Sequence, residues 1–439
     1  MRITVVVGLC LAAAASTAQA EEAMFRGNLA HTGVYGGNPI PSAPKLAWTF
    51  HTNGMVMSSP AVADGTVYIG SNDGRLYALD LGTGVKKWEF KTGARVTSSP
   101  AVSNGTVYFE SYDGSFYAVD AASGARKWKF ATAGEHRFTA KHLHGIEPAA
   151  EMMPDPFDFY LSSPAVWNGA VYFGSGDGNV YALDAATGAV KWKYRTGDVV
   201  HASPAIADGT LFIGSWDSWF YALDAARGAL KWRFKTGEDP AIHNQQGIQS
   251  SAAVANGVVY FGCRDSHLYA VDEKTGKQRW VFDTKPSWVI ASPAVRDGVV
   301  YAATSDSGQF FALDGKTGAQ LFALDFHQWP MFSSPALVSD FAYVGSHQGK
   351  LFAIDLKQHR HAWDFQTEGS KRLLAADSSP DGSVNYEAVQ PGNFYDDVVV
   401  AVANLAQLGQ VLGSPIMADS KLIFGTTDGN VYALSASRA

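Results

Sequence analysis

Residues 58–90 read SSPAVADGTVYIGSNDGRLYALDLGTGVKKWEF, and this stretch decides the fold. Apolar and polar residues alternate within it, and the pairs Asp64-Gly65, Asp73-Gly74 and Thr83-Gly84 interrupt the alternation. A period of two predicts half-buried strands, and Asp-Gly pairs favour the tight turns of antiparallel hairpins. The stretch therefore predicts four short antiparallel strands.

This stretch is one copy of a repeat that runs through the chain. Each copy starts at an anchor, which is a proline after a serine in seven copies and an alanine in the eighth. The anchors are Pro60, Pro100, Pro164, Pro204, Ala252, Pro293, Pro335 and Pro415. Their spacings are 40, 64, 40, 48, 41, 42 and 80 residues, so a period near 40 is lengthened by three insertions. A four-stranded repeat of this length is typical of a β-propeller blade.

The two ends of the chain predict how the ring closes. The eighth repeat stops at Ala439 without its fourth strand. Residues 45–50, which contain Trp48, match a fourth strand but precede the first anchor. An N-terminal strand that completes the last blade would leave no open sheet edge. We therefore predict an all-β fold, a single eight-bladed β-propeller with four-stranded blades and the N-terminal strand in the last blade.

Composition agrees with many short strands and excludes other classes. The 439 residues include 44 glycines and 13% aromatic residues but only 17% charged residues, which excludes a disordered or coiled-coil protein. The formal net charge is −7, and lysine and arginine form no cluster. Because phosphate binding needs a basic surface, we expect no nucleic-acid partner.

The N-terminus predicts export. Arg2 precedes an apolar run, and Ala18-Gln19-Ala20 is a small-x-small cleavage site, so residues 1–20 are predicted to be a signal peptide cleaved after Ala20. An uncleaved anchor is the alternative. The mature protein would be periplasmic or secreted, without a transmembrane helix, and we expect a monomer. Residues 21–44 would form an N-terminal extension and residues 45–439 the propeller.

The repeat also resembles a known family. The run Ala78-Leu79-Asp80-x-x-Thr83-Gly84-x-x-x-Trp88 is similar to the repeat of the pyrroloquinoline-quinone (PQQ) propeller superfamily of quinoprotein alcohol dehydrogenases, and it recurs at 118–128, 182–192 and 270–280. The resemblance implies that the repeated tryptophans dock neighbouring blades and do not contact a cofactor. These are Trp48, Trp88, Trp128, Trp192, Trp232, Trp280 and Trp363, with Phe322 at the corresponding place in the sixth repeat.

The breaks in the repeat predict where a ligand or partner binds. The insertions near 134–160, 238–249 and 368–410 all link one blade to the next, so they emerge on one face together with the hairpins between the second and third strands. Loops gathered at one end of a rigid scaffold commonly carry binding sites. The third insertion contains an apolar stretch, 398–408, long enough for a helix of about three turns. Such a helix would cap the face or dock a partner; the alternative, which we favour, is that it packs onto the propeller, because an apolar helix usually buries itself locally.

Bulky and polar residues replace the regular turn residues on that face. Aromatic walls with converging polar groups are what a small-molecule or carbohydrate-like pocket needs. The alternative is that the same side chains pack the long loops against the propeller. The ligand-binding candidates are His142, His144, His201, Trp216, Trp219, His243, Asn244, Arg264, Trp288, His327, Trp329 and His347.

The first insertion carries more titratable residues, including Asp155 and Asp158. If His142 and His144 lay on an extended segment, both imidazoles would face one side, but a metal would need a third ligand from elsewhere. We therefore predict no metal site.

Two functions are compatible with these observations. The first is a non-catalytic binding or assembly protein of the cell envelope, which uses the insertion face to bind an envelope protein or a small ligand. It is similar to the propeller lipoprotein of outer-membrane β-barrel assembly and needs no cofactor. The alternative is a PQQ-dependent quinoprotein dehydrogenase that oxidises an alcohol or sugar, with PQQ and Ca²⁺ as cofactors. The vicinal cysteine pair of that family is impossible here, because Cys263 is the one cysteine of the mature chain. We favour the binding protein and leave open whether the chain is an enzyme.

Overall fold

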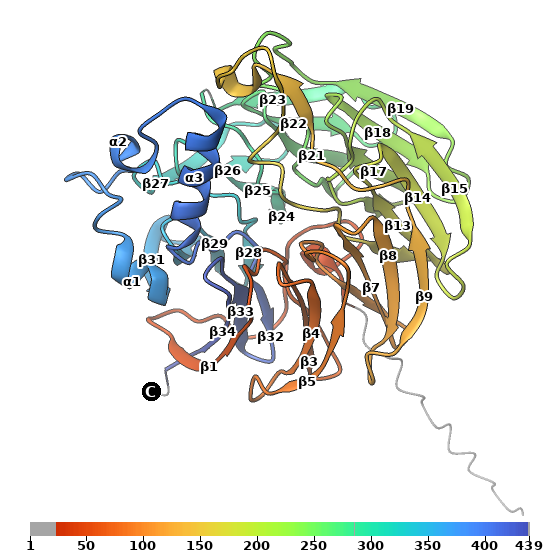
Figure 1. The fold of residues 1–439 in the computed structure, drawn as a ribbon, viewed down its shortest axis with the longest axis horizontal. Helices are drawn as coiled ribbons and strands as arrows, with labels where there is room; N and C mark the ends of the chain where they lie inside the picture. The colour runs from red at the N-terminus through yellow and green to blue at the C-terminus, as the bar shows by residue number, and fades with distance from the viewer. Residues whose placement is uncertain (1–22, 285, 438–439) are drawn as a thin grey trace, which may run out of the picture.

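The computed structural model describes residues 23–284 and 286–437. Eight four-stranded sheets surround a central axis, as Figure 1 shows, so the predicted eight-bladed propeller is confirmed. The predicted signal peptide lies outside the described residues. Among the described residues, no helix is both long and apolar enough to cross a membrane.

Seven blades are each built from strands that are consecutive in the sequence. Blade 1 comprises β2 (Ala61–Ala63), β3 (Thr66–Ser71), β4 (Arg75–Asp80) and β5 (Lys86–Lys91). Blade 2 comprises β6 (Ala101–Ser103), β7 (Thr106–Ser111), β8 (Ser115–Asp120) and β9 (Arg126–Ala131). Blade 3 comprises β12 (Ala165–Trp167), β13 (Ala170–Gly174), β14 (Asn179–Asp184) and β15 (Val190–Arg195). Blade 4 comprises β16 (Ala205–Ala207), β17 (Thr210–Gly214), β18 (Trp219–Asp224) and β19 (Leu230–Lys235).

The remaining blades follow the same order from the axis outward. Blade 5 comprises β20 (Ala253–Ala255), β21 (Val258–Cys263), β22 (His267–Asp272) and β23 (Gln278–Asp283). Blade 6 comprises β24 (Ala294–Arg296), β25 (Val299–Ala303), β26 (Gln309–Asp314) and β27 (Gln320–Asp325). Blade 7 comprises β28 (Ala336–Val338), β29 (Phe341–Gly345), β30 (Lys350–Asp355) and β31 (Arg360–Gln366). Blade 8 comprises β32 (Ile416–Ala418), β33 (Lys421–Gly425), β34 (Asn430–Ser435) and β1 (Lys45–His51).

Blade 8 closes the ring as the sequence predicts. Strand β1 is antiparallel to β34, with Trp48 opposite Ala433 and Phe50 opposite Val431. This pairing joins the two ends of the chain and gives blade 8 its fourth strand. It therefore covers the outer edge that β34 would otherwise expose.

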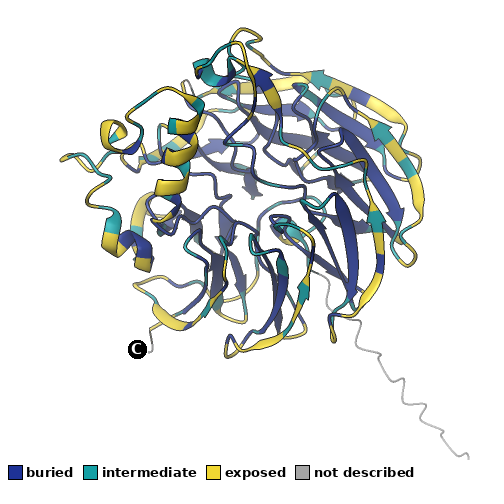
Figure 2. Ribbon diagram, in the orientation of Figure 1, coloured by how far each residue is buried: buried dark blue, intermediate teal, exposed yellow. Residues whose placement is uncertain are grey.

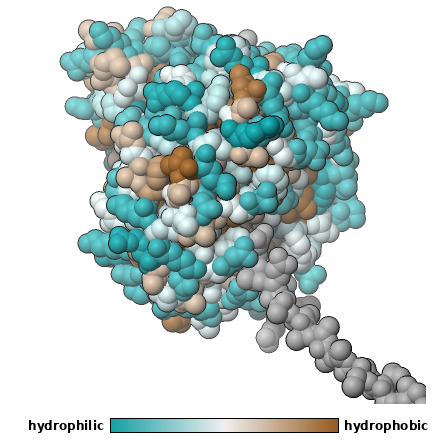
Figure 3. All heavy atoms as spheres, turned by 90° about the vertical axis from the view of Figure 1, so that its right-hand side faces the viewer, coloured by the Kyte–Doolittle hydropathy of each residue, from teal (hydrophilic) through white to brown (hydrophobic). Residues whose placement is uncertain are grey.

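Burial falls from the axis outward. Every residue of β3 and β7 is buried, whereas the outer strands β5 and β15 have no fully buried residue. Figure 2 shows the inner strands in dark blue and much of the outer strands in yellow. The side wall seen in Figure 3 is mostly hydrophilic, with small separate hydrophobic patches. The apolar residues therefore pack mainly between blades.

The repeated tryptophans lie between neighbouring blades. Six of the seven indoles donate a hydrogen bond from Nε1 to the next blade; Trp232, for example, donates to the Glu273 carbonyl at 2.9 Å. Trp363 instead donates to the Ile40 carbonyl of the N-terminal segment at 2.8 Å. A bulge in the outer strand, where Ala222 pairs with Trp232 but Leu223 pairs with Leu230, helps to aim the ring. The ring also covers the turn glycine of the next blade, Gly276.

Blade 6 departs from this arrangement in two positions that contact each other. Phe322 replaces the tryptophan, and the facing turn residue of blade 7 is His359 instead of glycine. The two rings stack at 4.3 Å with an interplanar angle of 14°. A smaller aromatic ring thus leaves room for the imidazole, so the boundary stays filled.

We expect an alanine at Gly276 to be far more damaging than an alanine at Gly105. Both glycines have a left-handed backbone, with φ of +67° and +66°, so the conformational cost is matched. A Cβ at Gly276 would lie 2.5 Å from the Trp232 ring, whereas nothing lies within 4 Å of one at Gly105. Denaturant unfolding should show Gly276→Ala to be about 1–3 kcal/mol less stable than Gly105→Ala. Equal losses would mean that the indole does not fix the boundary.

Candidate functional site

Three insertions gather on one face and form a structure that we call the cap, residues 134–160, 238–249 and 368–410. The cap contains β10 (Thr139–Lys141), η2 (Leu143–Gly145), β11 (Met152–Pro154), α1 (Glu368–Leu373), α2 (Tyr386–Val389) and α3 (Tyr395–Ala406). Figure 1 shows α2 and α3 beside β27 and β26 of blade 6, and α1 beside β31 of blade 7. The insertions contact one another, because His144 N–H donates to the Ile242 carbonyl at 2.6 Å and Tyr395 N–H donates to the Glu147 carbonyl at 2.8 Å.

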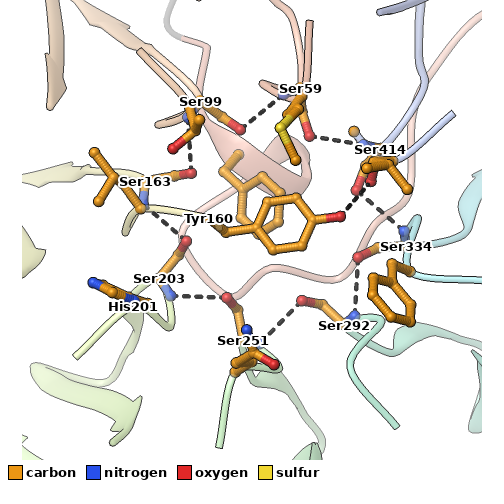
Figure 4. Close-up of a pocket in the computed structure, with 18 of the residues that line it drawn as sticks. Ser59, Ser99, Tyr160, Ser163, His201, Ser203, Ser251, Ser292, Ser334 and Ser414 are labelled. Carbon is orange, nitrogen blue, oxygen red and sulfur yellow. Dashed lines mark hydrogen bonds between the residues drawn. The ribbon is translucent and has the colours of Figure 1, made fainter. Parts of the chain in front are cut away.

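Below the cap, a ring of eight serines surrounds the axis (Figure 4). Each backbone N–H donates to the hydroxyl of the next serine, and the last bond, from Ser414 to Ser59 at 2.8 Å, closes the circle. The members are Ser59, Ser99, Ser163, Ser203, Ser251, Ser292, Ser334 and Ser414. Tyr160 lies across this ring and its hydroxyl donates to the Leu412 carbonyl at 3.2 Å. The enclosed cavity measures about 50 Å³, which leaves room for a few water molecules.

A buried ionic cluster attaches the first insertion to blade 5. Asp155 accepts a hydrogen bond from Arg264 Nη1 at 2.8 Å, and His144 Nε2 lies 3.0 Å from the same carboxylate oxygen. Asn244 from the second insertion contacts the other ring nitrogen of His144 at 3.0 Å. Burial would raise the pKa of Asp155, but Arg264 and His144 outweigh it and hold that pKa well below its usual range. The carboxylate is therefore charged at every physiological pH.

Two tryptophans enclose the guanidinium of this cluster. Arg264 lies 3.9 Å from the centre of the Trp288 ring and 4.6 Å from that of Trp216. Trp216 in turn stacks on Phe138 of the cap at 4.8 Å. A cation held between aromatic faces gains electrostatic stabilisation in addition to its ion pair. Five predicted candidates, Arg264, Trp216, Trp288, His144 and Asn244, thus meet in one cluster that packs the cap onto the propeller.

His201 forms a second ionic cluster with the first insertion. Its Nδ1 lies 2.6 Å from Asp158 and its Nε2 lies 2.9 Å from Glu135, and all three side chains are almost fully buried. Burial disfavours a charged imidazole, but Asp158 and Glu135 more than compensate and raise the pKa of His201 to about 10. The ring is therefore an imidazolium that donates from both nitrogens at neutral pH.

Glu110 lies beside this second cluster. Burial, together with the charges of Glu135 and Asp177, raises the pKa of Glu110 well above its usual value. Its position in the strand is glycine in six other blades, for example Gly70, where a Cβ would collide with Val96. Blade 3 has Tyr160 at the place of Val96, and that side chain turns into the channel (Figure 4). Glu110 is thus a buried acid whose surroundings favour its neutral form, at a position where six other blades have glycine.

A cavity of about 250 Å³ lies between α3 and the channel mouth. We call it the α3 cavity. Apolar side chains from the cap, including Phe157, Phe159 and Leu405, form much of its wall. Its polar lining comes from Arg95, Arg137, Asn72, His347, Gln410 and Thr427. Of these, Asn72, His347 and Thr427 each stand twelve residues after a repeat anchor, so one position of the repeat contributes three of the lining residues.

Several polar atoms at the α3 cavity lack a partner among the described residues. They are Asn72 Oδ1, Arg137 Nε and His347 Nε2, all buried. The described arginines that form ion pairs are Arg75, Arg227, Arg264, Arg279 and Arg296. Arg95 and Arg137 are not among them, and Arg95 lies over the Tyr112 ring at 3.8 Å. Burial lowers the pKa of His347 to about 3, so its imidazole is neutral.

The other predicted candidates lie apart from both clusters and from the cavity. Trp329 is buried and its indole donates to the Gly382 carbonyl at 2.9 Å, so it packs the third insertion. His243 contacts Gln246 at 2.6 Å within the second insertion. Trp219 lies under Arg233 at 4.1 Å. His327 is exposed, and His142 is half-buried. The candidates therefore do not form one pocket.

The segment that contains His142 and His144 is not extended. His142 and His144 have left-handed backbone conformations, with φ of 53° and 57°, at the 3₁₀ turn η2. His144 faces Asp155, and nothing brings His142 to the same point. Within residues 23–284 and 286–437, no group of three or more His, Cys, Asp or Glu side chains is arranged to hold a metal ion.

The family model described as outer membrane protein assembly factor BamB matches residues 42–155, 160–281 and 242–438. The chain belongs to this family. It is thus a BamB-like PQQ propeller, as its repeat indicates. No match is found among curated proteins.

Solved structures share the fold of this BamB-like propeller at low sequence identity. BamB from Moraxella catarrhalis is 16% identical, with a TM-score of 0.63 over 91% of this chain and 99% of that one. A europium-containing methanol dehydrogenase is 15% identical, with a TM-score of 0.68 over 93% and 96%. Quinohemoprotein alcohol dehydrogenase from Comamonas testosteroni is 14% identical, with a TM-score of 0.68 over 94% and 81%. Since an assembly factor and dehydrogenases share this fold, function must be argued from the site.

Proposed function

We propose that this BamB-like propeller is a binding protein of the cell envelope and that it holds a small, mostly apolar anion in the α3 cavity. The observation that carries the proposal is the pair Arg95 and Arg137, which line an apolar cavity without a carboxylate partner in the described chain. A guanidinium presents five N–H donors and is always charged, so an anion is its natural complement. Envelope location is supported by the family and by the predicted signal peptide.

The size and lining of the cavity define the ligand class. A volume of about 250 Å³ is slightly below the ~300–1,000 Å³ range of drug-sized pockets. The walls from α3 and from Phe157 and Phe159 suit an alkyl chain or a single ring. The neutral His347 imidazole, protonated at Nε2, would donate a hydrogen bond to the anionic end, whereas the unpartnered Asn72 Oδ1 can only accept and does not bind it. A medium-chain carboxylate meets these requirements.

Calorimetric titration with octanoate and with 1-octanol tests the proposal, because the two probes differ mainly in charge. We expect octanoate to bind about tenfold or more tightly, since a charged hydrogen bond contributes roughly 1.5–3 kcal/mol. Arg95→Met and Arg137→Met should each abolish most of this preference. Both substitutions keep an unbranched apolar stem in the cavity wall.

Arg233→Met is the matched control. Arg233 also lies over an aromatic ring, that of Trp219, but it does not line the cavity. This variant should keep the preference for octanoate. The proposal fails if octanoate and octanol bind equally, or if neither cavity variant changes their ratio.

The dehydrogenase alternative receives less support from the residues. Ca²⁺ prefers six to eight oxygen ligands, and the described chain contains no cluster of acidic side chains arranged for a metal. The serine ring encloses about 50 Å³ and Tyr160 covers it, so a tricyclic quinone does not fit there. PQQ with Ca²⁺ should be included among the probes, with dye reduction by alcohols as the readout. Turnover would favour the enzyme, whereas binding without turnover agrees with our proposal.

A further inference from the structure

The face opposite the cap is covered by the N-terminal segment, residues 23–40. This segment runs across the inner strands and its carbonyls accept hydrogen bonds from them. The donors are the backbone N–H groups of Val102, Ile206, Val254, Val295 and Leu337, and the acceptors are the carbonyls of Ala23, Leu29, Ala30, Thr32 and Gly33, at 2.6 to 2.9 Å. Each donor is the middle residue of the innermost strand of its blade. The segment thus pairs with the inner edges of blades 2, 4, 5, 6 and 7.

Blades 8 and 1 lack this covering. Val62 is opposite Val67 in blade 1 and Met417 is opposite Leu422 in blade 8, the same register that Val102 and Leu337 have in their blades. In an antiparallel pair of this register, the N–H of the middle residue points away from its ladder partner. Among residues 23–284 and 286–437, no hydrogen bond joins Val62 or Met417 to the N-terminal segment.

A groove of about 670 Å³ lies along these two inner strands. Residues 60–62 and 416–418 line it from the blades, and Ala23, Met24 and residues 35–37 line it from both ends of the N-terminal segment. The groove is therefore the gap that the segment leaves in its circuit of the ring. Blade 3 also receives no backbone hydrogen bond from the segment among the described residues, but it does not line this groove, and Met24 packs against the cluster that contains Val166.

The Tyr35 side chain is a second indication that the groove between blades 8 and 1 binds a polar partner. It belongs to the groove lining, and its hydroxyl is buried without a hydrogen-bond partner in the described chain. Buried polar groups usually have a partner, so an unpaired hydroxyl beside unpaired strand edges is consistent with a polar backbone that binds there.

We propose that the groove between blades 8 and 1 binds an extended segment of another polypeptide. Its carbonyls accept hydrogen bonds from the N–H groups of Val62 and Met417, and its backbone also satisfies the Tyr35 hydroxyl. The occupant is an extended backbone because the groove continues an interface that already holds one, in the manner of strand addition. Small side chains suit it, since the carbonyls already bonded belong mostly to small residues such as Ala23, Ala30 and Gly33.

The probe is an end-capped fluorescent peptide with the sequence of residues 28–35, Asn-Leu-Ala-His-Thr-Gly-Val-Tyr, titrated onto the chain that begins at Glu21. We expect saturable binding by fluorescence anisotropy, and slower deuterium exchange in residues 60–63 and 415–418 on binding. The double variant Val62→Pro with Met417→Pro removes both donors and should bind at least about tenfold more weakly. Val166→Pro, at the same register in blade 3, should bind as the unsubstituted chain does.

Three outcomes would overturn the proposal. One is the absence of saturable binding up to millimolar peptide, and another is equal binding to the double proline variant. The third concerns the protein without peptide. Residues 60–63 could be protected from deuterium exchange in the chain that begins at Glu21 but not in one that begins at Ala23. That result would mean that the protein's own N-terminus occupies the groove. Exchange in the unsubstituted chain decides the question even if the double variant does not fold.

Discussion

Replacing Arg264 by methionine is expected to lower the free energy of unfolding by about 3–5 kcal/mol, as when one partner of a buried ion pair is removed. The Arg264 side chain is 0% exposed and so is that of Asp155, its partner at 2.8 Å. Without the guanidinium, the carboxylate keeps its charge in a dry environment and retains mainly His144 and one backbone N–H. The ring faces of Trp216 and Trp288 also lose their cation.

Arg227→Met is the control for this measurement. Arg227 also pairs with an aspartate, Asp224 at 3.2 Å, but its side chain is 79% exposed. Exposed pairs contribute roughly 0–1 kcal/mol, so this variant should unfold almost as the unsubstituted protein does. Denaturant unfolding of both variants checks the prediction. A loss below about 1 kcal/mol for Arg264→Met would show that the cluster does not hold the cap.

The second large effect is a fall in stability as the pH rises from about 6.5 to 9.5. Asp158 and Glu135 overcome the effect of burial and raise the pKa of His201 to about 10, above its usual value of 6.5. A raised pKa means that the folded protein holds the proton more tightly than the unfolded chain. Its contribution is complete below pH 6.5 and is lost as the pH approaches 10. At about 1.4 kcal/mol per pH unit, the loss is on the order of 3–5 kcal/mol.

Two variants separate His201 from the other titrating groups. His201→Gln should be less stable at pH 6.5 and should show a much flatter dependence between pH 6.5 and 9.5. Glu110→Gln, which removes the neighbouring acid of raised pKa, should gain stability near neutral pH and should keep the part of the slope that His201 contributes. Thermal unfolding across the pH series provides the measurement. An unchanged slope in His201→Gln would contradict the assignment.

The fold could be predicted almost completely from the sequence because the repeat encodes it locally. Most hairpins have an Asp-Gly, Asn-Gly or Thr-Gly turn, and the surplus strand around Trp48 specifies how the ring closes. The insertions lack such a repeat. Whether Trp216, Arg264 and Trp288 bind a ligand or pack a loop depends on what covers them, and a sequence does not state burial. The structure buries all three beneath the first insertion.

The α3 cavity was missed for a related reason. Arg95 stands five residues before an anchor, in a link of ordinary length between two blades. Nothing in the sequence therefore marks it as a candidate binding residue. Aligning all eight repeats by their anchors would have helped. The same position holds Met55, Phe159 and Gln410, which also line the cavity, and the glycine position that contains Glu110 would have stood out. The partner elements of the cavity, α3 and the first insertion, remain beyond such an alignment.

A crystal structure of the protein with octanoate tests the central proposal most directly. We predict the carboxylate within hydrogen-bond distance of Arg95 and Arg137, and the alkyl chain between α3 and the side chains of Phe157 and Phe159. Octanoate bound elsewhere, or an α3 cavity in which both guanidinium groups pair with the protein's own carboxylates, would contradict the proposal.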